Sequence, residues 1–91
     1  MDVRWLPRAI SDYQVVLSYL ELKWGRKVRE AFIGRVMFVI GLIEKFPKLY
    51  PVSSKKLDIR RCVITKQTSI FYRASENQIE IIAFRDNRKK K

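Results

Sequence analysis

The sequence predicts an α+β domain with the element order β-α-α-β-β-β, in which a helical hairpin packs on an antiparallel β-meander. Up to Pro47, apolar residues recur mainly at helical spacing. After it come three runs rich in Ile, Val, Phe and Tyr, separated by short polar connectors. Connectors this short join neighbouring antiparallel strands, so the second part of the chain is expected to form a meander.

The chain has 91 residues, of which 47% are hydrophobic, and this predicts one domain spanning residues 1–91 with a real core. No apolar run approaches the roughly 18 residues of a membrane span. The single cysteine, Cys62, excludes an internal disulfide, and without histidine neither a metal site nor a cofactor is expected. The N-terminus lacks the pattern of a signal peptide, and a reducing cytoplasm is the expected location.

The first elements follow from proline, glycine and helical periodicity. A short strand is expected over Val3–Leu6, ended by Pro7. Pro7 suits a first helical turn, although Ser11 or Asp12 could cap the helix instead. The helix is expected to end at Gly25, and its apolar stripe is Ile10, Tyr13, Leu17, Leu20 and Trp24.

A second helix is expected from about Arg26 to Phe46, with Val28, Phe32, Val36, Val39 and Ile43 as its stripe. The run Met37–Ile40 leaves little room for a polar face. We therefore expect this helix to be buried on more than one side, between the first helix and the sheet. The alternative is that Phe38 and its neighbours await a partner chain.

The three strands are expected over Leu57–Thr65, Ser69–Ala74 and Ile79–Arg85. Apolar residues of the first strand change parity, which indicates either a bulge near Arg60-Arg61 or a sheet covered on both sides. In the last strand, apolar residues occupy both alternating sets of positions, which favours a central strand buried on both faces. Residues 88–91 are expected to be a frayed basic tail.

Charge is the strongest compositional feature, with 20 basic and 9 acidic residues and a net charge of +11. Residues 55–91 hold 11 of the Lys and Arg residues and 4 of the Asp and Glu residues. The predicted sheet is therefore expected to meet a phosphate polyanion or an acidic protein. The alternative is that the charge serves only solubility.

The candidate chemistry is that of Arg, Lys and Tyr. The chain has no histidine and no glycine-rich phosphate loop, and Cys62 sits in mid-strand, where packing is the simpler role. Asp86 lies between Arg85 and Arg88 and is expected to be an ion-pair partner rather than a general acid. Arginine and lysine can bind phosphate and stabilise developing negative charge.

The order of elements and four segments, SDYQVVLSYLELKWG, FPKLYP, IRRCVITKQTSIFYR and IEIIAFRDNR, resemble the RelE/ParE superfamily of type II toxins. The resemblance covers nearly the whole chain and implies a RelE/ParE-like fold. It also implies a small basic toxin of the plasmid-stabilisation type, which arrests growth and is neutralised by a cognate acidic antitoxin, with which it could form a hetero-oligomer.

The superfamily divides by target, into RelE-like members that cut mRNA on the ribosome and ParE-like members that poison DNA gyrase. Ser69 stands where ribonuclease members often hold an arginine, and no Tyr or His follows Arg88. These departures favour gyrase inhibition, with a ribosome-dependent mRNA endonuclease as the alternative, so whether the chain is an enzyme stays open.

The resemblance and the charge together give the candidate site residues. Arg60 and Arg61 cannot both face the target, because adjacent strand residues point to opposite faces. We expect Arg61 and Arg88 to carry the activity, with Arg73 third, and these three are the catalytic candidates if the chain is an enzyme. The expected target-binding residues are Lys55, Lys56, Arg60, Arg61, Tyr72, Arg73, Arg85 and Arg88.

Overall fold

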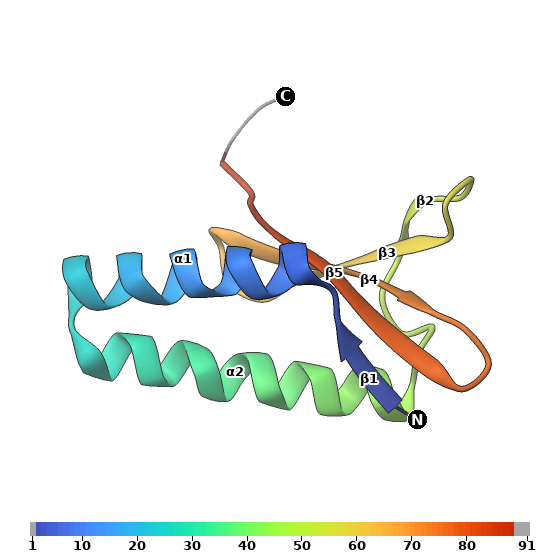
Figure 1. Cartoon of the computed structure of the whole chain (residues 1–91), viewed down its shortest axis with the longest axis horizontal. Coiled ribbons are helices and arrows are strands. Elements are labelled where there is room, and N and C mark those ends of the chain that lie inside the picture. Colours follow the sequence, from blue (N-terminus) through green and yellow to red (C-terminus); the bar gives the residue numbers. More distant parts are fainter. Residues whose placement is uncertain (1, 89–91) are drawn as a thin grey trace.

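The computed structural model describes residues 2–88, and its elements confirm the predicted order with one additional strand. The N-terminal strand and the hairpin are β1 (Asp2–Trp5), α1 (Pro7–Trp24) and α2 (Arg26–Lys45). They are followed by β2 (Val52–Ser54), β3 (Ile59–Val63), β4 (Thr68–Ala74) and β5 (Gln78–Asp86). The five strands form one sheet in the order β1-β5-β4-β3-β2, in which β1 runs parallel to β5 and the other neighbours are antiparallel (Figure 1).

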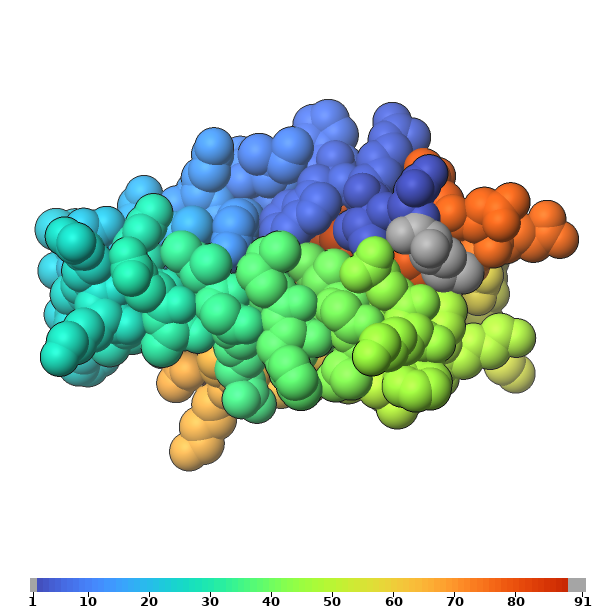
Figure 2. Space-filling view, turned by 90° about the horizontal axis from the view of Figure 1, so that it is seen from below, coloured from blue at the N-terminus to red at the C-terminus, as the bar shows by residue number. Residues whose placement is uncertain are grey.

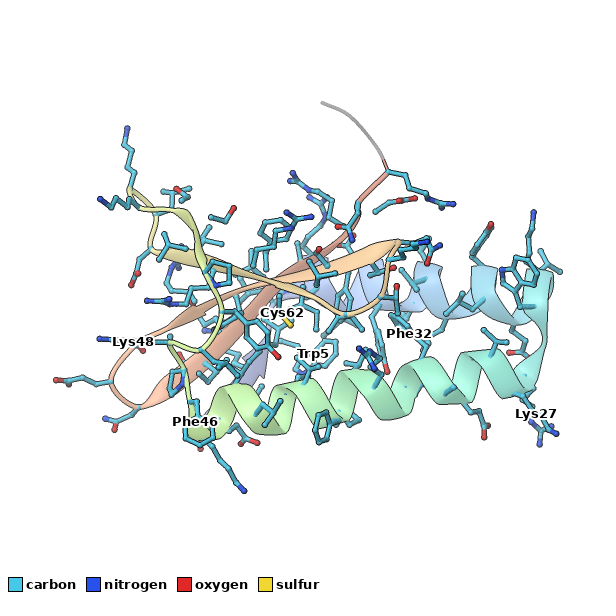
Figure 3. The ribbon with its side chains drawn as sticks, turned by 180° about the vertical axis from the view of Figure 1, so that it is seen from behind. Trp5, Lys27, Phe32, Phe46, Lys48 and Cys62 are labelled. Carbon is cyan, nitrogen blue, oxygen red and sulfur yellow. The ribbon has the colours of Figure 1, made fainter. Side chains whose placement is uncertain are left out.

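The helical hairpin packs on one side of this sheet and extends well beyond it at the Gly25 end (Figure 1). The core lies between the two layers, where Trp5, Phe32 and Cys62 are found (Figure 3). None of the helices in the described part of the chain is long and apolar enough to cross a membrane. This arrangement leaves the opposite side of the sheet without a covering layer of helices.

Helix α1 begins at Pro7 with Leu6 as its N-cap, so the alternative caps Ser11 and Asp12 were wrong. Asp12 instead lies inside the helix, and its carboxylate accepts a hydrogen bond from the Phe84 backbone N–H at 3.0 Å. The predicted stripe is confirmed in the middle of the helix but not at its two ends. Tyr13, Leu17 and Leu20 pack on the core, whereas Ile10 and Trp24 are exposed.

Helix α2 follows Gly25, whose φ of 99° is a conformation that suits glycine. Its buried residues are Phe32, Val36, Val39, Ile40 and Ile43, close to the predicted stripe. Met37 and Phe38, however, are 55% and 67% exposed, so the expectation that α2 is buried on more than one side was wrong. The reason is that α2 forms an outer boundary of the molecule, with no element beyond it (Figure 2).

The strand predicted over Leu57–Thr65 was too long, because β3 covers only Ile59–Val63. Strand β2 was not predicted. Lys55–Asp58 form a turn in which Asp58 adopts a φ of 56°, a left-handed conformation that Asp tolerates better than most residues. Leu57 therefore lies in the turn and is 54% exposed. The turn lets Val52–Ser54 fold back and pair with β3.

The bulge predicted near Arg60-Arg61 is not found in β3, because these residues keep a continuous register with β4. The pairing of β3 with β2 instead has a register shift between Val52 and Ser54. In β5, Ile81 pairs with Tyr72 while Ala83 pairs with Phe71, which leaves Ile82 as the extra residue. The bulge turns Ile79, Ile81 and Phe84 all toward the helices. β5 is an interior strand as predicted, but it is not buried on both faces, because Arg85 is exposed.

Candidate functional site

The side of the sheet that faces away from the helices carries most of the predicted site. Alternation along β3, β4 and β5 turns the core residues inward and the intervening residues outward. We call this surface the open face, and its defining residues are Arg61, Ser69, Phe71, Arg73, Glu80 and Arg85. Arg60 and Tyr72 have the opposite parity and point to the helix side.

Arg61 is held on the open face by a network of side chains. Its Nε donates to Ser69 Oγ at 3.1 Å and its Nη2 donates to Asn87 Oδ1 at 3.0 Å. Ser69 Oγ also donates to Asn87 Oδ1, at 2.6 Å. Asn87 is itself fixed, because its Nδ2 donates to the carbonyl oxygens of Thr65 and Lys66. The network orients the guanidinium while leaving part of its donor capacity unused.

Phe71 provides an aromatic surface beside Arg61. It is the cross-strand neighbour of Arg61, and the guanidinium of Arg85 lies 5.2 Å from the centre of its ring. One cation therefore lies over this partly buried ring, and a second stands on the neighbouring strand. Such a platform suits a stacked base, a phosphate or an acidic protein surface.

Arg73 lies on the same face, but its charge is partly neutralised. Its Nη1 forms an ion pair with Glu80 at 3.2 Å, and Arg4 approaches the other carboxylate oxygen of Glu80 at 3.9 Å. The Arg73 Nε also donates to the carbonyl oxygen of Leu57. Arg73 thus belongs with the β2–β3 turn, where the exposed Lys55 and Lys56 also lie, rather than with Arg61.

Two predicted residues, Arg60 and Tyr72, serve the connector between α2 and the sheet. The Nη1 of Arg60 donates to the carbonyl oxygen of Tyr50 at 2.7 Å. Tyr72 is fully buried, and its hydroxyl donates to the carbonyl oxygen of Pro47 at 2.7 Å. The structure therefore places both among the residues that hold the connector, and Tyr72 does not reach the surface.

Arg88 lies just past β5, away from the Arg73 end of the open face. Its Nε and Nη2 donate to the two carboxylate oxygens of Asp86 at 3.1 and 3.0 Å. These hydrogen bonds and the charge of Asp86 raise the pKa of Arg88 above its ordinary value, so it stays a cation. The ion pair predicted for Asp86 is confirmed. Lys89–Lys91, most of the predicted tail, lie outside the described residues.

Arg88 stands at the rim of a groove that the sequence analysis missed. The groove has a volume of about 1160 Å³ and lies between the projecting part of the hairpin, the β3–β4 turn and the end of β5. We call it the hairpin groove. Its apolar lining includes Val15, Tyr19, Leu20, Trp24, Val28 and Phe32, and its cations are Arg8, Arg35, Arg88 and the open-face residue Arg85. The sequence shows that these positions are apolar, but it does not show that the sheet leaves them uncovered.

The titratable groups of the interior do not act on either surface. Burial raises the pKa of the Cys62 thiol and that of the Tyr72 hydroxyl. Burial, together with a hydrogen bond to Cys62, raises the pKa of Tyr50 to about 12. These groups stay protonated at neutral pH, and Cys62 is a packed core residue as expected. Within residues 2–88, no group of three acidic or cysteine side chains is placed to hold a metal ion.

Comparison with known proteins bears on the whole chain. The family described as ParE toxin of type II toxin-antitoxin system, parDE, matches residues 3–90. A structure of the chromosomal ParDE TA system from P. aeruginosa has a TM-score of 0.78 and 12% identity, over 94% of this chain and 95% of that chain. The YoeB/ParE toxin from Agrobacterium tumefaciens has a TM-score of 0.71 and 16% identity, over 96% and 99%. No curated protein matches. At these identities the two structures show a shared fold.

Proposed function

We propose that this chain, which belongs to the ParE toxin family of type II toxin-antitoxin systems, arrests growth by inhibiting DNA gyrase through its open face. The observation that carries the proposal is the chemistry of that face. It presents Arg61, Arg85 and Phe71 in a fixed arrangement, and the chain has no histidine. Such a surface can bind an anionic partner, but it offers a poor acid–base pair for cutting RNA. Because gyrase acts on chromosomal DNA, the site of action is the cytoplasm.

The proposed silencing partner is a cognate acidic antitoxin that docks in the hairpin groove and forms a hetero-oligomer with the toxin. Tyr19 and Trp24 are 46% and 62% exposed there, and both are residue types that often anchor protein interfaces. Arg8, Arg35 and Arg88 line the same groove. An amphipathic segment with apolar residues on one side and acids beside these cations matches it, and such a segment can fold on binding.

The test of the target is a supercoiling assay with purified gyrase. We expect the chain to inhibit supercoiling and Arg61→Ala to lose that inhibition while keeping its melting temperature. Lys27→Ala is the matched control, because it removes the same charge at the far end of the hairpin (Figure 3). Full inhibition by a folded Arg61→Ala variant would move the target site away from the open face.

A ribosome-dependent mRNA endonuclease is the second candidate, and the Phe71 platform is the observation that favours it. A ring that lies under Arg85 and pairs across the strands with Arg61 could stack a base near cations that hold its phosphate. Incubation of the chain with translating ribosomes and a defined mRNA distinguishes the two. Cleavage of that mRNA, with gyrase unaffected, would replace the first proposal by this one.

A further inference from the structure

We infer that the outward side of α2 is a self-association surface through which two copies of this chain pair as antiparallel helices. This surface is defined by Glu30, Gly34, Met37, Phe38, Gly41 and Lys45. These residues recur at steps of three and four, so they share one side of the helix. It is the side opposite the buried stripe, and α2 lies uncovered across that view of the molecule (Figure 2).

The surface has the shape that close helix pairing requires. A Cβ built at Gly34 or at Gly41 would meet nothing within 4 Å, so the backbone is open to approach at two points seven residues apart. Between them stand the exposed side chains of Met37 and Phe38. Helix axes approach more closely where the side chains at the contact are small, and the larger residues then fill the space on either side.

The second copy is the occupant because the surface complements itself. An antiparallel pairing that sets Gly34 opposite Gly41 of the second copy also sets Glu30 opposite Lys45, and Met37 opposite Phe38. Two-fold symmetry repeats each of these pairs, as an isologous interface requires. The pairing therefore contains two Glu30–Lys45 ion pairs, one on each side of an apolar centre.

Local charge supports the same occupant. The chain carries 20 basic and 9 acidic residues, but along this surface and its flanks the balance is three to two, Arg26, Lys27 and Lys45 against Glu30 and Glu44. Glu30 has only a long contact of 3.9 Å with Arg26 and remains largely exposed. A partner of strong charge, such as a nucleic acid, would gain little from a strip this close to neutral. A second copy, which presents the charges in reverse order, fits it.

The surface is separate from both sites described above. None of its six defining residues lines the hairpin groove, and none lies on the open face. A single helix pair buries less than the roughly 1,200 Å² of standard specific complexes, so we expect a weak dimer with a Kd on the order of 10 µM. The pairing could therefore form with the antitoxin or the target in place.

Charge reversal tests the register directly. Sedimentation equilibrium at about 0.15 M ionic strength, where the net charge is screened beyond roughly 8 Å, should show a monomer–dimer equilibrium for the natural chain. Glu30→Lys alone and Lys45→Glu alone should each weaken the dimer at least tenfold, because each creates two like-charge contacts. The two single variants mixed together should pair again, since every contact in the mixed dimer is then between opposite charges.

The apolar centre has its own matched test. Phe38→Ser should also weaken the dimer tenfold or more, whereas Leu22→Ser, at a still more exposed apolar residue on α1, should not. All these side chains are exposed, and thermal melts check that each variant is folded. A chain that stays monomeric at several hundred micromolar overturns the inference. So does a dimer that Phe38→Ser leaves intact, or one that the mixed charge variants fail to restore.

Discussion

The open face and the hairpin groove differ in how they hold their cations. On the open face, Arg61 is fixed by Ser69 and Asn87, and Arg85 lies over Phe71, so charge is presented in a rigid pattern. In the groove, apolar side chains form much of the lining, and the cations Arg8 and Arg88 are paired with the acids Asp12 and Asp86 of the same groove. The contrast shows that net charge alone does not locate function in this chain. A rigid cationic pattern suits the target, while an apolar channel with cations suits an acidic antitoxin.

Arg88 tests whether the two regions are separate, and we expect the largest effect there. Arg88→Ala should abolish growth arrest on plates and leave the melting temperature nearly unchanged, because the side chain is exposed. Arg88→Lys should restore growth arrest only in part, since lysine keeps the charge but loses the forked hydrogen bonding to a phosphate or carboxylate. A truncation after Arg88 is the control and should remain toxic, because the last three lysines act only through a salt-screened field.

Because Arg88 lies beside the groove, Arg88→Ala can also show whether this arginine serves the target, the antitoxin or both. If Arg88→Ala keeps growth arrest but loses antitoxin binding, this arginine belongs to the partner site alone. If both are lost, the two surfaces share Arg88 as well as Arg85, which lines the groove and lies over Phe71. Full toxicity and full antitoxin binding in a folded Arg88→Ala protein would remove it from both sites.

The next largest effect is expected from substituting the aromatic residues of the hairpin groove, which tests whether the groove binds the antitoxin without acting on the target. Trp24→Glu should weaken antitoxin binding by roughly 30-fold, the loss typical of an aromatic anchor, while growth arrest without antitoxin stays unchanged. Isothermal titration with the antitoxin measures the first quantity and plate growth the second. An unchanged affinity would place the antitoxin elsewhere, for instance along the free edge of β2.

The smallest effect concerns the core that both regions rest on. The pKa of Tyr50 is raised to about 12 in the folded chain from an ordinary value of 10, chiefly by burial. A group whose pKa is raised by folding contributes stability fully below its unfolded pKa and loses it as pH rises through the folded pKa. The free energy of unfolding, measured by urea titration, should therefore fall between pH 10 and pH 12. Tyr50→Phe should flatten that fall in part, because folding also raises the pKa values of Tyr13, Tyr72 and Cys62.

The fold was largely predictable because it depends on local periodicity. Helical spacing up to Trp24 and between Arg26 and Lys45, and β-branched runs between short connectors, predicted both helices and four of the strands. The sequence shows that the apolar residues of β3 and β5 switch from one set of alternating positions to the other. It does not show why they switch. A bulge at Ile82 and burial on two faces leave the same mark on a single strand, and only the register with β4 separates them.

The sites were less predictable because they depend on distant segments. Adjacent strand residues point to opposite faces, so only one of Arg60 and Arg61 could face outward. The sequence analysis chose Arg61, and the structure places it on the open face. Asn87 could not be assigned a role, since it acts only after β5 returns beside the turn at Thr65–Lys66. The hairpin groove forms because α1 and α2 extend beyond the sheet. The apolar periodicity of each helix does not reveal how far the helices extend past the strands.

The pairing of β1 with β5 has a consequence for the order of assembly during synthesis. The first four residues of the fold take their place beside Ile79 and Ile81, which are among the last parts of the sheet to be made. β1 must therefore remain unpaired until β5 has been synthesised. We expect a chain ending before Gln78 to lack cooperative melting and toxicity, so that an unfinished copy does no harm to the cell that makes it.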